Sequence, residues 1–147
     1  MEAPVHIVFA GESDNDSALL NHASLMISDQ VLFHRFREVQ KLIDECNTNA
    51  NAIPDIIFLD FKIPRRRSLE HLKQLRECDL FRDTVMVIYS DFSSPAMIDQ
   101  CYYYGADFYL RKTTNEKHLS TFIQSLLSML DQNLHRNADK SRFLVKL

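Results

Sequence analysis

The sequence predicts an α/β fold in which helices cover both faces of a parallel sheet. Short apolar runs alternate with segments of helical periodicity, and several runs are apolar throughout rather than at every second residue. Strands of this kind are typical of parallel sheets, because helices bury both faces. The length of 147 residues suits one domain.

The first half of the chain contains two predicted strands and two predicted helices. HIVF at residues 6–9 reads as a buried strand, and residues 31–36 form a second, more polar one. Between them, residues 14–26 predict a helix with one apolar face, formed by Leu19, Leu20, Ala23 and Met26. The next helix has apolar residues at i, i+3, i+4 and i+7, namely Val39, Leu42, Ile43 and Cys46. Residues 47–54 have the composition of a loop.

The second half contains three more strands and three more helices. The strands are predicted at 55–60, 84–90 and 107–110, and DIIFLD at 55–60 is the strongest of the chain. The helices are marked by Leu69, Leu72 and Leu75, by residues 95–104, and by Leu119, Phe122, Ile123, Leu126, Leu127 and Leu130. We expect one domain over residues 1–131, followed by a polar tail, 132–147, with a docked end.

Composition excludes several classes of function. The net charge of −3 gives no general attraction to nucleic acid or a membrane. No apolar run approaches the roughly 20 residues of a membrane span. The three cysteines form no CxxC pair, which favours reduced thiols in a cytoplasmic protein. The two glycines exclude both common phosphate-binding glycine motifs.

Polar residues follow the carboxyl ends of four predicted strands. Gly11 and Glu12 end the first strand, and the other positions are Asp60, Ser90 and Lys112. Each alone suits a turn or a solvated surface, but functional groups of parallel sheets gather at this edge. An aspartate nucleophile, a metal-binding carboxylate and a lysine that neutralises charge together predict phosphoryl transfer.

Three segments resemble the receiver domain of two-component response regulators. DIIFLDFKIPRRRSLEHLKQLR at 55–76 is similar to the family's phosphoacceptor strand, Met-Pro-like turn and third helix. VMVIYSDFSS at 85–94 resembles the strand that ends in a hydroxyl residue, and YYYGADFYLRK at 102–112 resembles the segment that ends in a lysine. The resemblance covers about residues 5–130 and implies a flavodoxin-like five-stranded sheet of order 2-1-3-4-5.

The resemblance implies roles for the residues at the sheet edge. Asp60 would accept a phosphoryl group from a sensor histidine kinase, a phosphotransfer protein or a small phosphodonor, and Lys112 would contact that group. Ser90 would be the switch hydroxyl. Tyr109 would be the switch aromatic, which turns inward when Ser90 is drawn to the phosphoryl group, whereas periodicity alone makes it a surface residue.

The resemblance also implies Mg²⁺ as cofactor, held by Glu12, Asp60 and the backbone carbonyl of Lys62. The family usually has two acids where this chain has Gly11 and Glu12. The Lys62 side chain is close enough in sequence to reach Asp60 and compete with the metal. We therefore expect weaker Mg²⁺ binding than is usual in the family.

Three further positions depart from the family pattern or influence the lifetime of the phosphoryl group. Ser68 stands in place of a glycine, and Thr113 in place of a proline that often has a cis bond. Phe92, two residues after Ser90, would screen the phosphoryl group from water. Together with Lys62, this predicts slow hydrolysis.

The acidic stretch GESDND, residues 11–16, divides between two roles. Ser13 and Asp16 have the spacing of a helix capping box, and Asp14 suits the positive end of a helix dipole. The alternative is that Asp14 or Asp16 turns back to help bind a metal. The RRR stretch at 65–67 is expected in a loop, either simply solvated or attracting an anionic donor or partner.

Two functions remain open. The first is a phosphorylation-controlled switch of a two-component phosphorelay, acting through a downstream protein or by relay because residues 132–147 are too short for an output domain. It would catalyse only its own phosphorylation and dephosphorylation, with no direct nucleic-acid or membrane partner. A homodimer through helix 95–104, strand 107–110 and the last helix is also possible in this family. The alternative is a pseudo-receiver, a protein-binding module that needs no phosphate. A metal-dependent hydrolase would need a general base, and no histidine is placed for one.

Overall fold

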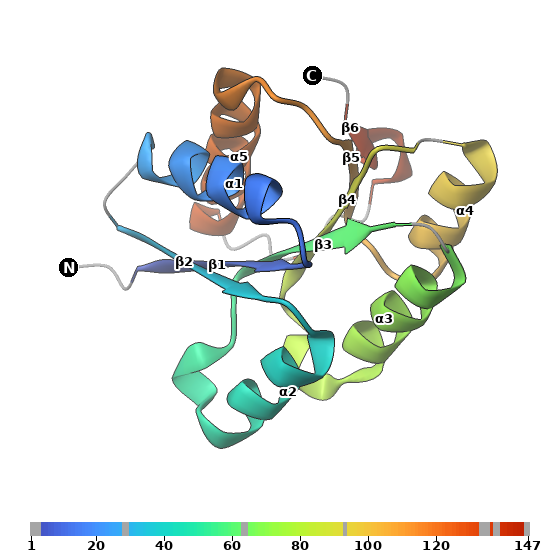
Figure 1. Cartoon of the computed structure of the whole chain (residues 1–147), viewed down its shortest axis with the longest axis horizontal. Helices are drawn as coiled ribbons and strands as arrows, with labels where there is room; N and C mark the ends of the chain where they lie inside the picture. Colours follow the sequence, from blue (N-terminus) through green and yellow to red (C-terminus); the bar gives the residue numbers. More distant parts are fainter. Residues whose placement is uncertain are drawn as a thin grey trace.

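The predicted flavodoxin-like α/β fold is confirmed in the computed structural model shown in Figure 1. Every paired strand runs parallel, in the order β2-β1-β3-β4-β5-β6. The first five strands therefore have the expected order, and a sixth extends the sheet. The structure describes residues 4–27, 30–62, 65–92, 94–132, 136 and 139–145.

The strands and helices lie close to their predicted positions. The strands are β1 (Val5–Ala10), β2 (Val31–Phe36), β3 (Ile56–Phe61), β4 (Val85–Ser90), β5 (Phe108–Arg111) and β6 (Leu144–Val145). The helices are α1 (Asp14–Leu25), α2 (Val39–Thr48), α3 (Arg65–Glu77), α4 (Pro95–Tyr103) and α5 (Glu116–Asp131). In the described ranges, no helix has both the length and the apolar character needed to cross a membrane. Pro64 of the expected turn and His135 lie outside these ranges.

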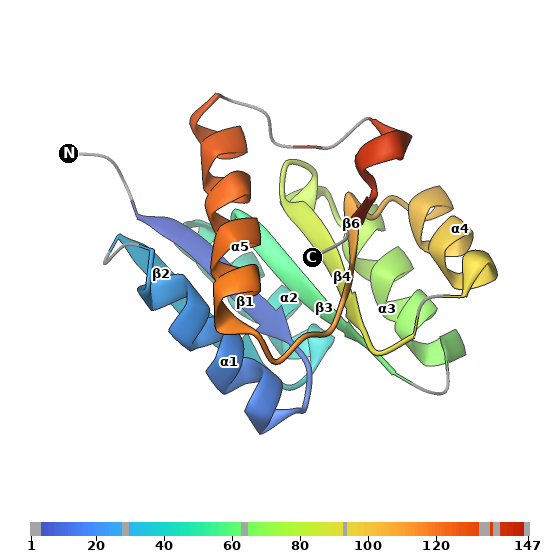
Figure 2. The same cartoon turned by 90° about the horizontal axis from the view of Figure 1, so that it is seen from above.

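Helices bury both faces of the sheet, as the apolar strands predict. All residues of β3 and β4 are buried. On one face, α1 and α5 pack against side chains such as Phe9 and Phe58. On the other face, α2, α3 and α4 pack against side chains such as Leu59 and Ile88 (Figures 1 and 2). This leaves the carboxyl ends of β1, β3, β4 and β5 at one edge of the sheet.

Two local predictions were wrong. Met26 is 57% exposed, because α1 ends at Leu25 and Met26 is its C-cap, past the last turn that packs on the core. The RRR stretch, residues 65–67, begins α3 rather than forming a loop. Arg66 and Arg67 are exposed, and polar residues of this kind suit an exposed helix start as well as they suit a loop, so composition alone did not separate the two.

The sixth strand comes from the predicted tail and confirms its docked end. Leu144 and Val145 pair with Tyr109 and Leu110 of β5, and Figure 2 shows β6 at the end of the sheet. Phe143, just before β6, is buried in the core that α2, α3 and α4 cover. The expected dimer surface thus includes an edge of β5 that this segment covers.

The connection from α4 to β5 depends on a glycine. Gly105 has φ of +96°, and a Cβ there would lie 2.6 Å from Cγ of Arg76. Arg76 runs beneath this turn to the fully buried Asp107, 3.1 Å away. Asp107 also accepts the backbone N–H of Met86 at 2.8 Å. Burial lowers the pKa of Arg76 to about 10, although Asp107 opposes that shift. This network sets where β5 begins beside β4.

We expect Gly105→Ala to lower the free energy of unfolding by about 2 kcal/mol, since it combines an unfavourable φ with a steric clash. Urea unfolding followed by circular dichroism measures the change. Tyr103→Ala is the control, because Tyr103 is 80% exposed in the same connection, and its effect should stay within about 0.5 kcal/mol. Equal effects of the two substitutions would contradict this account of the turn.

Candidate functional site

Asp60 is a buried carboxylate at the carboxyl edge of the sheet. Its side chain is only 1% exposed, and Oδ1 lies 2.8 Å from Nζ of Lys112. Oδ2 lies 3.8 Å from Nζ of Lys62 and receives no hydrogen bond from the described residues. A buried carboxylate is tolerated only beside compensating charge. The structure therefore brings together Asp60 and Lys112, two of the predicted site residues, and confirms that the Lys62 side chain reaches the Asp60 carboxylate.

Lys112 connects Asp60 to a second acid. It follows β5, and its backbone N–H donates to the Ser90 carbonyl at 2.8 Å. Its Nζ lies 2.7 Å from Oδ2 of Asp16 as well as near Asp60. Burial disfavours the charged form of Lys112, but the hydrogen bonds to Asp16 and Asp60 outweigh it and raise its pKa. The lysine therefore stays protonated between the two carboxylates.

Asp16 is a site residue that the capping pattern concealed. The Ser13 hydroxyl accepts the Asp16 backbone N–H at 3.1 Å, so the predicted N-cap is present. The Asp16 carboxylate points to Lys112 instead of completing a capping box, which corrects that part of the prediction. Asp14 pairs with Arg35 at 2.8 Å. The spacing of Ser13 and Asp16 is that of a helix cap, and it gives no indication that Asp16 also contacts Lys112.

Arg35, at the end of β2, was also missed. Its guanidinium donates to the carbonyls of Gly11 at 3.1 Å and Glu12 at 2.6 Å. It thereby holds the loop that carries Glu12 at the edge of the sheet. The strand-end rule would have found Arg35 if it had been applied to the second strand as well.

Gly11 is required by close packing. A Cβ at this position would lie 2.6 Å from Cβ of Asp60 and 2.7 Å from Cζ of Phe9. Such contacts are too short for any side chain unless both neighbours move. The missing first acid is therefore part of how this chain packs Asp60, and not a free position in the site.

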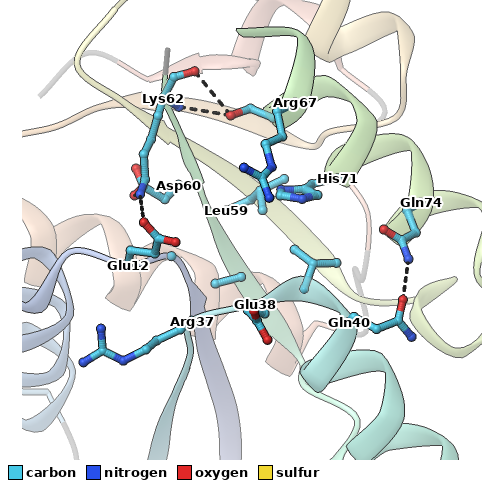
Figure 3. Close-up of a pocket in the computed structure, with 14 residues that line it drawn as sticks. Glu12, Arg37, Glu38, Gln40, Leu59, Asp60, Lys62, Arg67, His71 and Gln74 are labelled. Carbon is cyan, nitrogen blue, oxygen red and sulfur yellow. Dashed lines mark hydrogen bonds and ion pairs between the residues drawn. The ribbon is translucent and has the colours of Figure 1, made fainter. Parts of the chain in front are cut away.

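The Lys62 ammonium lies where the predicted metal ligands meet. Its Nζ is 3.1 Å from Oε2 of Glu12, and Figure 3 shows it beside both Glu12 and Asp60. The hydrogen bond and charge of Lys62 lower the pKa of Glu12. The Lys62 carbonyl instead accepts a hydrogen bond from the Ser68 hydroxyl, 3.4 Å away. In the described ranges, no three His, Cys, Asp or Glu side chains form a metal-binding group. Glu12 and Asp60 thus fit a divalent cation only if the ammonium withdraws.

Two hollows give access to Asp60. One, of about 430 Å³, lies between α2 and α3 and is lined by Lys62, Arg67 and His71 among others (Figure 3). The other, of about 750 Å³, is lined by Asp16, Lys112 and Phe92 among others. Both Asp60 and Lys112 line the second hollow.

Ser90 and Tyr109 are joined through the loop after β4. The fully buried Ser90 hydroxyl accepts the Phe92 N–H at 3.0 Å. The Tyr109 hydroxyl donates to the Phe92 carbonyl. Burial raises the pKa of Tyr109, while a hydrogen bond with Ser90 opposes the shift. Tyr109 is 0% exposed, so the surface position indicated by periodicity was wrong. Helix α4 and the segment before β6 cover this side of β5.

Sequence comparison finds one matching family. The family described as "Response regulator receiver domain" matches residues 13–124. The match begins directly after Gly11 and Glu12, where the chain departs most from the family pattern. Among curated proteins, none matches the chain.

Solved structures of response regulators have a similar fold. The response regulator RPA3017, in red light signalling of R. palustris, is 22% identical to this chain. The alignment covers 85% of this chain and 92% of RPA3017, with a TM-score of 0.70. The phosphorylated cyanobacterial phytochrome response regulator RcpA is 18% identical. Its alignment covers 89% of this chain and 96% of RcpA, with a TM-score of 0.72. The Mn²⁺-bound form of the response regulator Rcp1 is 20% identical. Its alignment covers 86% of this chain and 94% of Rcp1, with a TM-score of 0.66.

Lys62→Gln should tighten Mn²⁺ binding by about tenfold, because it removes a positive charge from beside the metal-binding carboxylates. Isothermal titration calorimetry on the purified chain measures the dissociation constant directly. Lys41→Gln removes the same charge from an exposed position of α2 and should change the Mn²⁺ dissociation constant by less than about twofold. If the two variants bind Mn²⁺ equally well, Lys62 does not compete with the metal.

Gly11→Asp should not restore a metal site, although it restores the acid that the family usually has. The new side chain would clash with Asp60 and Phe9 and lower the free energy of unfolding by about 1–3 kcal/mol. Asn15→Asp adds the same charge at an exposed position of the same helix start, and should change stability by at most about 0.5 kcal/mol. Tighter Mn²⁺ binding by Gly11→Asp at unchanged stability would refute the packing argument.

Proposed function

The chain belongs to the response regulator receiver family, and we propose that it is a phosphorylation-controlled switch that accepts a phosphoryl group on Asp60. One observation carries the proposal. The Asp60 carboxylate is buried, yet it lines an open hollow, with the Lys112 ammonium 2.8 Å from Oδ1 and the Lys62 ammonium 3.8 Å from Oδ2. This is the arrangement that a nucleophilic carboxylate needs.

In the proposed transfer, a carboxylate oxygen of Asp60 attacks the phosphorus of a phosphohistidine or of a small acyl phosphate. The bond from phosphorus to the leaving group breaks, and an aspartyl phosphate forms. Lys112 neutralises charge on the phosphoryl oxygens and is already protonated for that role. The chain catalyses only this transfer and the later hydrolysis.

Receiver domains generally bind Mg²⁺, and the similar Rcp1 structure is a Mn²⁺-bound form. In this chain Glu12, Asp60 and the Lys62 carbonyl would hold the ion, which would add positive charge near the phosphoryl oxygens. Lys62 already supplies positive charge between the two carboxylates. We therefore propose a weak Mg²⁺ site, for which the Lys62 ammonium competes.

The switch itself runs through Ser90. On phosphorylation the Ser90 hydroxyl donates to a phosphoryl oxygen, and the loop that contains Phe92 follows. Because Tyr109 donates to the Phe92 carbonyl, this movement changes the surface beside β5 by population shift. The partners proposed are a sensor histidine kinase or phosphotransfer protein and a downstream protein, in the cytoplasm.

A pseudo-receiver is the second candidate, and two observations favour it. Gly11 leaves no room for a first acid, and Lys62 occupies the space between the carboxylates. In this alternative the chain binds its partner constitutively through the same surface.

Incubation with a small acyl phosphate, followed by intact-mass measurement, separates the two candidates. We expect one phosphoryl group per chain in the parent protein and none in Asp60→Asn. Asp91→Asn removes an exposed acid beside the same hollow and should keep the adduct. Absence of the adduct from the parent protein at every Mg²⁺ concentration would favour the pseudo-receiver.

A further inference from the structure

We propose that Phe143 is a positioning residue for Tyr109, and that segment 139–145, docked through β6, holds this tyrosine inward. The inference rests on the proposed function for the role of Tyr109 as switch aromatic. The packing claim, that segment 139–145 keeps Tyr109 from solvent, does not depend on phosphorylation. Nothing in the family match, which ends at residue 124, includes this segment.

Backbone hydrogen bonds fasten the segment to β5. The Tyr109 N–H donates to the Phe143 carbonyl at 2.8 Å, and Leu144 and Val145 continue the parallel pairing. Just before β6, the Asp139 carboxylate accepts the Ser141 N–H and hydroxyl at 3.0 and 2.7 Å, which shapes the turn into the strand. The segment is therefore built into the sheet at the position of Tyr109.

Ring contacts join the segment to α4 and β5. The Phe143 ring lies 6.4 Å from the ring of Tyr109 and 5.3 Å, edge to face, from that of Tyr102. Lys140 Nζ lies 5.1 Å from the centroid of the Tyr102 ring. Upstream, Arg136 is fixed to the buried Asp107 at 2.6 Å. These contacts place an aromatic side chain of the segment directly against the switch tyrosine.

Tyr109 and segment 139–145 pack together and should move together. Tyr109 is 0% exposed, and Phe143 packs in the same core cluster beside its ring while β6 pairs along β5. For the Tyr109 ring to reach solvent on this side, the segment must leave. The docked segment and the inward tyrosine therefore stabilise each other, and by linkage a phosphoryl group that favours inward Tyr109 also favours the docked segment. A downstream protein at this end of the sheet would then contact β6 and not a bare β5.

Tyrosine nitration of the full chain by tetranitromethane, with the sites quantified by mass spectrometry, tests the inference. The chain contains its own references, since Tyr103 is 80% exposed and Tyr89 is 0% exposed. In the parent protein Tyr109 should react at less than about a tenth of the Tyr103 rate, because reaction requires local opening. Phe143→Ala should raise the Tyr109 rate at least about fivefold and leave Tyr89 protected.

Two further variants separate positioning from general loss of structure. Phe143→Leu keeps apolar bulk and should restore most of the protection of Tyr109. Leu144→Ala changes a residue of β6 that is 37% exposed and should leave the Tyr109 rate within about twofold of the parent. The inference is overturned if Tyr109 stays protected in Phe143→Ala, or if Tyr89 becomes reactive along with it, since that would indicate global unfolding. Because no step needs phosphate, this result and the phosphorylation result can fail separately.

Discussion

The burial of the Asp60 carboxylate is the constraint on which the rest of the site depends. A charge whose side chain is 1% exposed destabilises the fold by several kcal/mol unless it is compensated. Lys112 and Lys62 supply that compensation from two sides. Asp16 in turn balances Lys112, and Gly11 allows the close approach of Asp60 to β1. The acids and bases at this edge are thus a single electrostatic unit.

Strand β5 connects this unit to the C-terminal segment. Within five residues it contains Tyr109, which packs against Phe143, and leads to Lys112, which contacts Asp60. The Tyr109 hydroxyl also donates to the Phe92 carbonyl in the loop after β4, and the Phe92 N–H donates to the hydroxyl of Ser90 at the end of β4. Strand β5 thus connects the Asp60 site, through Lys112, and the loop after β4, through Tyr109, with the segment that contains Phe143.

Most of the fold could be predicted because burial on two faces leaves a direct trace in sequence. Fully apolar runs marked β3 and β4, and regular apolar stripes marked the helices. The same approach failed where local pattern and long-range contact disagree. Met26 continues the helical stripe but lies past the helix end. Tyr109 alternates as a surface residue, yet Phe143, more than thirty residues later, covers it.

The sequence by itself determined the parallel sheet, the strand ends and the gathering of Asp60, Ser90 and Lys112 at one edge. These follow from residue type and spacing along the chain. Only the tertiary structure decided that Asp16 turns to Lys112, that the Lys62 ammonium also pairs with Glu12, and that residues 144–145 add a sixth strand to the sheet. Those outcomes depend on which charges and rings meet after folding, and sequence spacing holds no information about a partner more than thirty residues away.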